Sequence, residues 1–275
     1  MTELHGTDFL YRRWDPAETE PAGPKAVFLL VHGLGAHPAR WDFLAKFLAA
    51  RGYPSYALAL RGFGPCPERP RGHIDSFKVW DQDVLALREL VGRDHPDRKV
   101  FLLGESMGGL IAFDFAGRHQ DSFAGVVLIA PAFKNGMKFP VSVYLKTAFL
   151  LPFAPKHMVD IPFTSERATR DVEYAAAMNA DPDEVRVASL KLLFSFLPVQ
   201  GRAARLAGKF TLPVLFLIPG IDYLVDERAA RRVFQKVAAP DKTIIEYPEM
   251  FHALTIDLGR EKVFRDIAEW TAKRV

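Results

Sequence analysis

The chain has little cysteine and no segregation of charge, and each absence excludes a class of protein. Cys66 is the only cysteine among 275 residues, so no disulfide can form within the chain and no thiolate metal site is expected. The 36 basic and 33 acidic residues give a formal net charge of +3, and neither sign collects into a run. We therefore expect no nucleic-acid partner and no polybasic membrane tail.

The chain also lacks an apolar run long enough to cross a membrane. Its most apolar stretch, residues 139–151, is interrupted by Lys146 and bounded by Pro140 and Pro152, whereas a transmembrane helix needs about 20 apolar residues. The first eight residues, MTELHGTD, have neither the basic start nor the apolar core of a signal peptide. Together with the single cysteine, this favours a reducing compartment, and we expect a cytoplasmic protein.

What the chain does have is a hydrophobic content of 49%, enough to bury the core of one large α/β domain. Short β-rich runs alternate with helical periods, which predicts a mostly parallel sheet with helices on both faces. Several runs are apolar almost throughout, as is typical of strands covered on both faces. We expect central strands at residues 26–31, 55–60, 99–103, 125–130, 213–218 and 242–247, an antiparallel edge strand at 9–14, and helices at 41–50, 76–91, 107–118, 226–237 and 260–273.

The alternation stops between residues 131 and 208, where Phe, Leu and Pro are frequent and no central strand is expected. This interval begins after one strand and ends before another, so it should lie over the carboxyl ends of the strands, where open α/β sheets bind ligands. We therefore expect a core at residues 1–130 and 209–275, with an inserted helical cap, or lid, at 131–208. The apolar stretch 139–151 is expected to be a lid helix packed on the core, and a face that touches lipid or lines an acyl pocket is the alternative.

One short motif indicates chemistry. Residues 104–109, Gly-Glu-Ser-Met-Gly-Gly, follow the apolar run at 100–103 and directly precede a predicted helix. In this setting a Gly-x-Ser-x-Gly turn exposes the serine hydroxyl, and its glycines leave room for a strained backbone and for close approach of strand and helix. The helix N-terminus adds partial positive charge where an anionic intermediate would form. Ser106 is therefore the predicted nucleophile.

A serine hydroxyl needs a base to take its proton, and the base needs a group that orients it. Of the eight histidines, His252 stands in the loop between the last strand and the last helix, from which it can reach across the strand ends to Ser106. The acid should follow another central strand, where Asp222 and Asp226 are both candidates. Asp226 stands at a helix N-cap position, which accounts for it structurally. We therefore assign the orienting role to Asp222.

An oxyanion intermediate needs two backbone N–H donors. Met107, the residue after the nucleophile, is expected to supply one of them. The other should come from the loop after an early strand, where the sequence His32-Gly33-Leu34-Gly35 has glycines that let the backbone turn its amides inward. We choose Leu34 as the second donor. His32 is expected to brace this turn by hydrogen bonds and not to act as a base.

These motifs together resemble the α/β-hydrolase superfamily, and within it the monoacylglycerol lipase and lysophospholipase group. The likeness covers nearly the whole chain and is carried by the order Ser, Asp, His and by residues 32–37, 60–64, 104–109, 222–226 and His252. It implies a serine carboxylester hydrolase without cofactor or metal, acting on a small ester that carries an apolar acyl chain. Ala59 and Phe63 depart from the pattern, because the family usually has aspartate and histidine there; these positions are mostly structural, so they bear on the subfamily and not on the triad.

Other reactions and one other class of protein compete with this interpretation. The same three residues would also serve a carbon–carbon bond hydrolase, a peptidase or a perhydrolase. A dehalogenase or an epoxide hydrolase is disfavoured, because those enzymes use aspartate where this chain has Ser106. A ligand-binding protein that has kept the fold without activity is opposed by the intact Ser, Asp, His and glycine turn. Our leading hypothesis is hydrolysis of a monoacylglycerol or a similar single-chain ester through an acyl-enzyme, with transient contact to a membrane or lipid aggregate through the cap as a further option.

Overall fold

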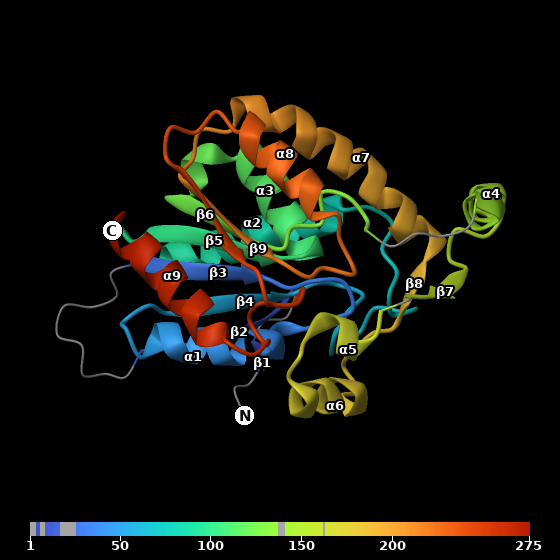
Figure 1. Ribbon diagram of the computed structural model, residues 1–275, viewed down its shortest axis with the longest axis horizontal. Helices are drawn as coiled ribbons and strands as arrows, with labels where there is room; N and C mark the ends of the chain where they lie inside the picture. The colour runs from blue at the N-terminus through green and yellow to red at the C-terminus, as the bar shows by residue number, and fades with distance from the viewer. Residues whose placement is uncertain (1–3, 6–8, 17–25, 137–140, 162) are drawn as a thin grey trace.

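The computed structural model describes residues 4–5, 9–16, 26–136, 141–161 and 163–275. Within these ranges, eight strands form one sheet in the order β1-β2-β4-β3-β5-β6-β9-β10 (Figure 1). Neighbouring strands from β4 to β10 are parallel, and β1 and β2 are antiparallel at one edge. The strands are β1 Leu4–His5, β2 Leu10–Trp14, β3 Ala26–Val31, β4 Ser55–Ala59, β5 Lys99–Glu105, β6 Gly125–Ile129, β9 Val214–Pro219 and β10 Lys242–Tyr247.

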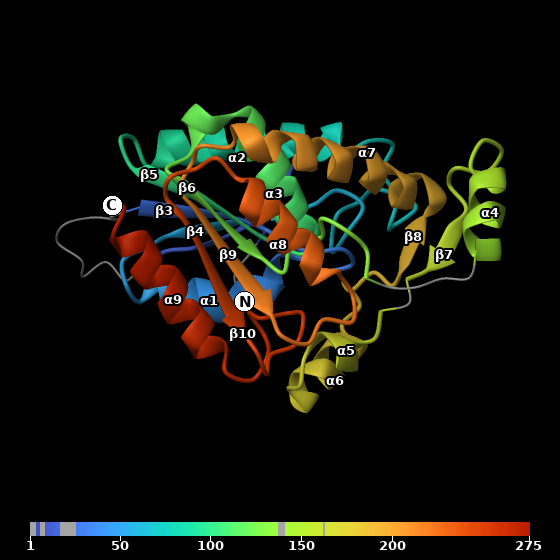
Figure 2. The ribbon, with the colours of Figure 1, turned by 45° about the horizontal axis from the view of Figure 1, so that its top comes forward.

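Helices cover both faces of this sheet. α1 and α9 lie on one face, and α2, α3 and α8 lie on the other (Figures 1 and 2). The bounds are α1 Asp42–Ala49, α2 Lys78–Asp94, α3 Met107–Arg118, α8 Glu227–Lys236 and α9 Arg260–Ala272. Alternate side chains of one strand pack against the helices on opposite faces of the sheet. In β3, Leu29 belongs to the hydrophobic cluster under α2 and α3, and Phe28 belongs to the cluster under α1 and α9. This two-sided burial explains why the central strands are apolar almost throughout.

The predicted α/β architecture is confirmed. The six central strands and the edge strand lie within two residues of their expected bounds, and the largest difference for a helix is at α2, which continues three residues further, to Asp94. The unpredicted strand β1 has two residues, which is too short for a hydrophobic period. Residues 1–3 and 6–8 of the N-terminal octapeptide lie outside the described residues.

The chain between β6 and β9 adds no strand to the central sheet within its described residues. It forms α4 Val141–Leu150, β7 Met158–Asp160, α5 Ser165–Ala168, α6 Val172–Ala180, β8 Val187–Ser189 and α7 Leu190–Leu206. β7 and β8 pair with each other in a separate antiparallel sheet. α7 returns along α3, where Arg202 Nε donates to Asp114 Oδ1 at 2.6 Å. We call this chain the β6–β9 segment.

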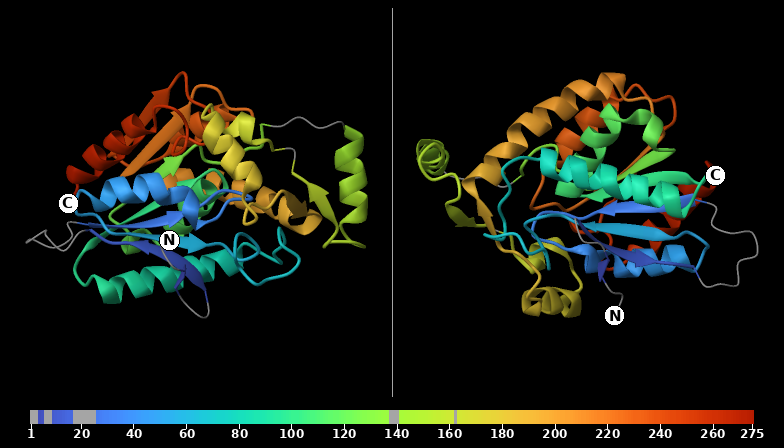
Figure 3. Two further views of the ribbon diagram at one scale, coloured as in Figure 1. Left: turned by 90° about the horizontal axis from the view of Figure 1, so that it is seen from below. Right: turned by 180° about the vertical axis from the view of Figure 1, so that it is seen from behind.

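Helix α4 corrects one expectation. It does not pack on the core: in every view it stands at the far end of the molecule from the central sheet (Figures 1 to 3). Val141, Leu145 and Phe149 are 67 to 72% exposed, and their spacing of four residues places them in one row along the helix. Phe139 and Pro140 of the expected lid helix lie outside the described residues. No described helix combines the length and the hydropathy that a transmembrane span requires.

Candidate active site

Ser106 occupies a strained turn between β5 and α3. Its backbone angles, φ 56° and ψ −117°, are unusual for a residue with a side chain. Two hydrogen bonds join this turn to the chain that follows β6: Ser106 N–H donates to Ile129 O at 2.9 Å, and Ala132 N–H donates to Ser106 O at 2.9 Å. A third, from Leu110 N–H to Ser106 O at 3.1 Å, begins α3. The turn is therefore fixed by the ends of β5 and β6 and not by Ser106 itself, and the side chain is left partly exposed.

The glycines of the motif allow the strand and the helix to approach closely. A Cβ on Gly104 would collide with the carbonyl oxygen of Gly108, and a Cβ on Gly108 would collide with the carbonyl oxygen of Val31. Neither glycine has a positive φ. Glycine is needed at positions 104 and 108 because a side chain would not fit there. The strained backbone angles are those of Ser106.

Asp222 and His252 are joined by a direct hydrogen bond. His252 Nδ1 lies 2.7 Å from Asp222 Oδ2, and both side chains are buried. Asp222 Oδ1 accepts hydrogen bonds from the N–H groups of Leu224 at 2.8 Å and Val225 at 3.0 Å. The carboxylate is therefore held by the turn after β9, and it favours the tautomer in which Nδ1 carries the proton and Nε2 is the free acceptor.

The pKa values of the pair move apart. Burial favours the neutral form of Asp222, but the charge and hydrogen bond of His252 outweigh it and lower the pKa of the carboxyl. Burial likewise opposes the charged form of His252, yet Asp222 and, more weakly, Glu105 raise the pKa of the imidazole above its ordinary value. The environment thus favours the charged form of the imidazole beside the carboxylate of Asp222.

One backbone and one side-chain hydrogen bond tie the loops that carry Asp222 and His252 to each other and to the strand end beside Ser106. Ile221 N–H donates to Met250 O at 3.1 Å, which ties the turn after β9 to the loop after β10. The hydroxyl of Thr255, in that second loop, donates to the carboxyl of Glu105 at 3.1 Å. Glu105 directly precedes Ser106, so the histidine loop is anchored beside the serine. Within the described residues Ser106 Oγ makes no hydrogen bond, and a free enzyme often forms its catalytic contacts only with substrate bound.

The loop after β3 lies against the serine. A Cβ on Gly33 would lie 3.2 Å from Ser106 Cβ and 3.8 Å from Ser106 Oγ. In the part of the chain that the structure describes, the N–H groups of Leu34 and Met107 donate no hydrogen bond, so both remain available. His32 braces the loop as expected: its Nε2 accepts from Leu60 N–H at 3.1 Å, its Nδ1 lies 2.9 Å from Gly33 O, and burial lowers its pKa to about 3.

The two departures from the family pattern and the alternative acid have structural roles. Ala59 and Phe63 are fully buried, and the Phe63 ring packs edge-on against His32. Asp226 caps α8 by accepting from Arg228 N–H at 3.1 Å, and its other oxygen accepts from Lys134 Nζ at 3.0 Å. Its carboxylate is therefore engaged away from the histidine, as the N-cap interpretation requires.

The sequence reasoning missed a group of buried charges around these loops. Arg40 pairs with Glu184 of the β6–β9 segment at 2.6 Å. Asp257 accepts from the backbone N–H groups of Phe251 at 2.8 Å and Arg170 at 2.6 Å, so it joins the histidine loop to the residues between α5 and α6. No local sequence pattern predicts these contacts, because most of them join residues that are far apart in the sequence.

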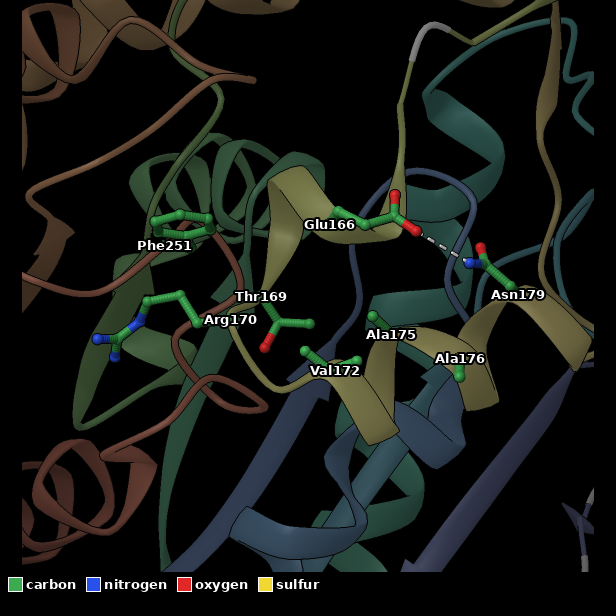
Figure 4. A pocket seen from close by; sticks show the side chains of 8 residues that line it. All are labelled: Glu166, Thr169, Arg170, Val172, Ala175, Ala176, Asn179 and Phe251. Carbon is green, nitrogen blue, oxygen red and sulfur yellow. Dashed lines mark hydrogen bonds between the residues drawn. The ribbon is translucent and has the colours of Figure 1, made fainter.

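A cavity of about 300 Å³ lies beside the histidine loop, between that loop and helices α5 and α6 (Figure 4). Its walls are formed by Glu166, Thr169, Arg170, Val172, Ala175, Ala176, Asn179 and Phe251. The polar wall groups are already partnered: Asn179 bonds Glu166, and Arg170 bonds Asp257. Ser106, Asp222 and His252 do not line this cavity. Across the described residues, no cluster of three or more His, Cys, Asp or Glu side chains could hold a metal ion.

Comparisons with known proteins show to which family the chain belongs. The family model described as serine aminopeptidase, S33, matches residues 22–259. Monoglyceride lipase of Mus musculus is 31% identical over 279 residues, covering 100% of this chain and 90% of that protein. Monoacylglycerol lipase of Mycolicibacterium smegmatis is 28% identical over 271 residues, covering 96% of this chain and 93% of that protein.

Solved structures give the same result. The crystal structure of Paleococcus ferrophilus monoacylglycerol lipase superimposes with a TM-score of 0.85 at 27% identity, covering 99% of this chain and 100% of that chain. A monoglyceride lipase from Saccharomyces cerevisiae, solved with a substrate analogue, shares the fold with a TM-score of 0.87 at 21% identity, covering 100% and 96%. The chain therefore belongs to the serine aminopeptidase S33 family, within the α/β-hydrolase superfamily.

Proposed function

We propose that this carboxylester hydrolase cleaves monoacylglycerols or similar single-chain lipid esters, with Ser106 as nucleophile, His252 as base and Asp222 as the group that orients the base. The observation that carries the proposal is the Ser106 turn beside the buried His252–Asp222 pair, whose 2.7 Å hydrogen bond leaves Nε2 free. Full-length likeness to monoglyceride lipases supports the substrate class.

In the acylation half of the reaction, Ser106 Oγ attacks the ester carbonyl while its proton passes to His252 Nε2. The carbonyl oxygen becomes an oxyanion, which we assign to the N–H groups of Leu34 and Met107. When the tetrahedral intermediate collapses, the bond to the alcohol oxygen breaks. His252 returns the proton to that oxygen, so glycerol or another alcohol leaves as a neutral molecule and the acyl group remains on Ser106.

Deacylation repeats these steps with water. His252 takes a proton from the water as its oxygen attacks the acyl carbonyl, and the same two N–H groups receive the oxyanion. Collapse of the second intermediate breaks the bond to Ser106 Oγ, which recovers its proton from His252, and the free acid is released. Every proton taken by the imidazole is returned, so these residues complete the hydrolysis of an ester with water alone.

We assign residues 131–208 to a cap over this site, with residues 1–130 and 209–275 as the core. Two contacts of the β6–β9 segment support the assignment. Val185 N–H donates to Gly35 O at 2.8 Å, next to the proposed donor Leu34, and Ala253 N–H donates to Ala168 O at 2.9 Å, next to His252. The segment thus touches the loops on two sides of the serine, at the carboxyl ends of β3 and β10.

We further propose that the exposed row on α4 contacts the surface of a lipid aggregate or membrane, from which a single-chain ester would be drawn. Val141, Leu145, Phe149 and the nearby Phe153 are 67 to 78% exposed, and Phe149 and Phe153 contact each other at 5.8 Å between ring centroids. Exposed apolar patches of this kind mark interaction surfaces. We also place the protein in the cytoplasm, in keeping with Cys66, which is a buried free thiol.

The first experiment measures hydrolysis of monoacylglycerols of rising chain length beside amide substrates of equal acyl length, with wild type and Ser106→Ala. We expect ester turnover to exceed amide turnover and Ser106→Ala to reduce kcat about 10⁶-fold. Full activity of Ser106→Ala, or faster cleavage of amides than of esters, would contradict the proposal. The amide arm decides against the peptidase alternative, which the family description keeps relevant.

The second experiment tests the α4 surface with the double variant Leu145→Ser and Phe149→Ser. We expect slower hydrolysis of monoacylglycerol presented in vesicles and an unchanged rate on a dissolved short-chain nitrophenyl ester. The control is Leu85→Ser, which changes an exposed leucine of α2 that is 40% exposed. Equal loss on both substrates, or no loss on vesicles, would refute a lipid-contact role for the row.

A further inference from the structure

A second buried carboxyl group lies beside the proposed base. Glu105 is the last residue of β5 and directly precedes Ser106, and it is only 6% exposed. Its Oε1 accepts a hydrogen bond from the Thr255 hydroxyl at 3.1 Å, and Thr255 is fully buried three residues after His252. The mechanism given above makes no use of Glu105, although it forms the link between the strand of the nucleophile and the loop of the base.

The charges around these groups come from several elements. Glu105 faces His252 and Arg40, and the neutral phenol of Tyr174 on α6 lies near it. Asp222 and Glu105 raise the pKa of His252, and Arg40 lowers it. Arg40 is itself paired with Glu184 at 2.6 Å, which offsets much of its charge. The carboxyl groups of Asp222 and Glu105 thus both favour the charged form of the His252 imidazole, and Asp222 has the larger effect.

A carboxyl group buried at position 105 lowers the stability of the fold when it ionises. Burial raises the pKa of Glu105, and the opposing effects of His252, Arg40 and the Thr255 hydrogen bonds do not restore its ordinary value. A group whose pKa is raised by folding contributes stability at low pH that is lost as the pH rises through the raised pKa. An uncharged side chain of the same size would avoid this cost. Stability therefore does not account for glutamate at this position.

We propose that Glu105 is a positioning residue for hydrolysis: through Thr255 it fixes the loop that carries His252, and its carboxylate stabilises the imidazolium that forms when His252 takes the Ser106 proton. The inference rests on the proposed function, because it assumes that His252 is the base. Asp222 holds Nδ1 by a hydrogen bond, whereas Glu105 acts through Thr255 and through its charge. The two carboxylates thus stabilise the same cation from different loops.

Two variants separate the charge from the hydrogen bond. Glu105→Gln keeps the size and an oxygen that can accept from Thr255, but it removes the charge. Thr255→Val keeps the charge and the shape, but it removes the hydroxyl. Glu246→Gln is the control, because Glu246 lies on the edge strand β10 and pairs with Arg231 at the surface. Each variant is assayed for kcat and KM on a dissolved ester and for the pH dependence of Ser106 labelling by a fluorophosphonate.

We expect Glu105→Gln to lower kcat about 10- to 100-fold with KM within about twofold, because the lost interaction belongs to the charged imidazole. The acidic limb of the labelling profile should move to lower pH by about half a unit to one unit, since one anion near His252 is gone. Thr255→Val should lower kcat without moving the limb downward. Glu105→Gln should also melt no lower than wild type at pH 8, and its advantage should shrink at pH 4.5.

The inference is overturned if Glu105→Gln leaves kcat within twofold of wild type, or if kcat falls while the acidic limb stays in place, because a purely structural role predicts that second pattern. If Glu105→Gln does not fold, Thr255→Val decides, and a kcat equal to that of wild type refutes the anchoring role. Failure of the proposed function gives a different result, in which wild-type protein is not labelled at Ser106 at all.

Discussion

Replacement of Asp222 by asparagine tests the orientation of the base at a single atom. The change keeps the shape of the side chain, and its remaining oxygen can still accept from the N–H groups of Leu224 and Val225, which lie 2.8 and 3.0 Å from Oδ1 in the wild type. The group facing His252 Nδ1 at 2.7 Å then becomes a donor. An N–H facing Nδ1 requires the tautomer that has its proton on Nε2, and that tautomer cannot take the Ser106 proton.

The expected loss of kcat follows from the change of the His252 tautomer. A triad with the wrong tautomer loses about 10⁴-fold in kcat, which corresponds to about 5 kcal/mol of transition-state stabilisation. The pKa of His252 should also fall, because the charge and hydrogen bond of Asp222 are the largest of the causes that raise it. The fold should be kept, since the turn after β9 retains its two backbone hydrogen bonds. We therefore expect a folded protein with an unchanged KM and little turnover.

The assay compares Asp222→Asn with Asp226→Asn on a nitrophenyl ester, with thermal melting of each. Asp226 is the matched control, because it lies in the same turn and caps α8 without contact to His252. We expect Asp226→Asn to keep kcat within about twofold and to lose at most about 1 kcal/mol of stability, since asparagine also caps helices. Loss of activity in Asp226→Asn, or a kcat for Asp222→Asn within tenfold of wild type, would refute the assignment.

Three further predictions concern pH, space and buried charge. His252 must be neutral to accept a proton, and its pKa is raised above the ordinary value of 6.5. We therefore expect kcat/KM to fall on acidification along a limb centred above pH 6.5. A limb centred below pH 6.5 would contradict the raised pKa of His252. Gly108→Ala should lower the free energy of unfolding by about 1–3 kcal/mol, because its Cβ would collide with Val31 O. Thermal melting measures this loss, and an unchanged Tm would show that the turn can hold a side chain at this position. Asp114→Ala should cost about 1–2 kcal/mol in urea unfolding, because the partly exposed Arg202 and Arg118 would lose their hydrogen-bonded partner. An unchanged free energy of unfolding would count against these pairs.

Much of the fold could be predicted because its signals are local. Each central strand is a short apolar run, and each flanking helix shows its own period, so the order of elements follows from the chain itself. The Ser106 turn is equally local, since six consecutive residues contain the strand end, Ser106 and the glycines that the close packing requires. The choice between Asp222 and Asp226 also needed only neighbouring residues, because a helix start explains the second.

The remainder depends on contacts between distant residues. Thr255 meets Glu105 across 150 positions, and Arg40 meets Glu184 across 144, so neither pair leaves a period or motif in the sequence. The position of α4 was mispredicted for a related reason. Its apolar residues satisfy the pattern of a packed helix, and only the three-dimensional arrangement reveals that the row faces away from the core. The roles assigned to the triad and to the oxyanion donors stay predictions that depend on activity measurements.

The central claim is that Ser106 forms a covalent acyl intermediate during ester hydrolysis, and mass spectrometry of the digested protein tests it most directly. Wild-type protein is mixed with a nitrophenyl ester of a medium-chain fatty acid, quenched in acid within one turnover and digested, and Ser106→Ala is treated in the same way. We predict one added acyl group on the peptide that contains Ser106 in the wild type, its disappearance once the ester is consumed, and no acylation of the variant. An acyl group on any other residue, or hydrolysis by the wild type with no acylated Ser106 peptide at any quench time, would contradict the account.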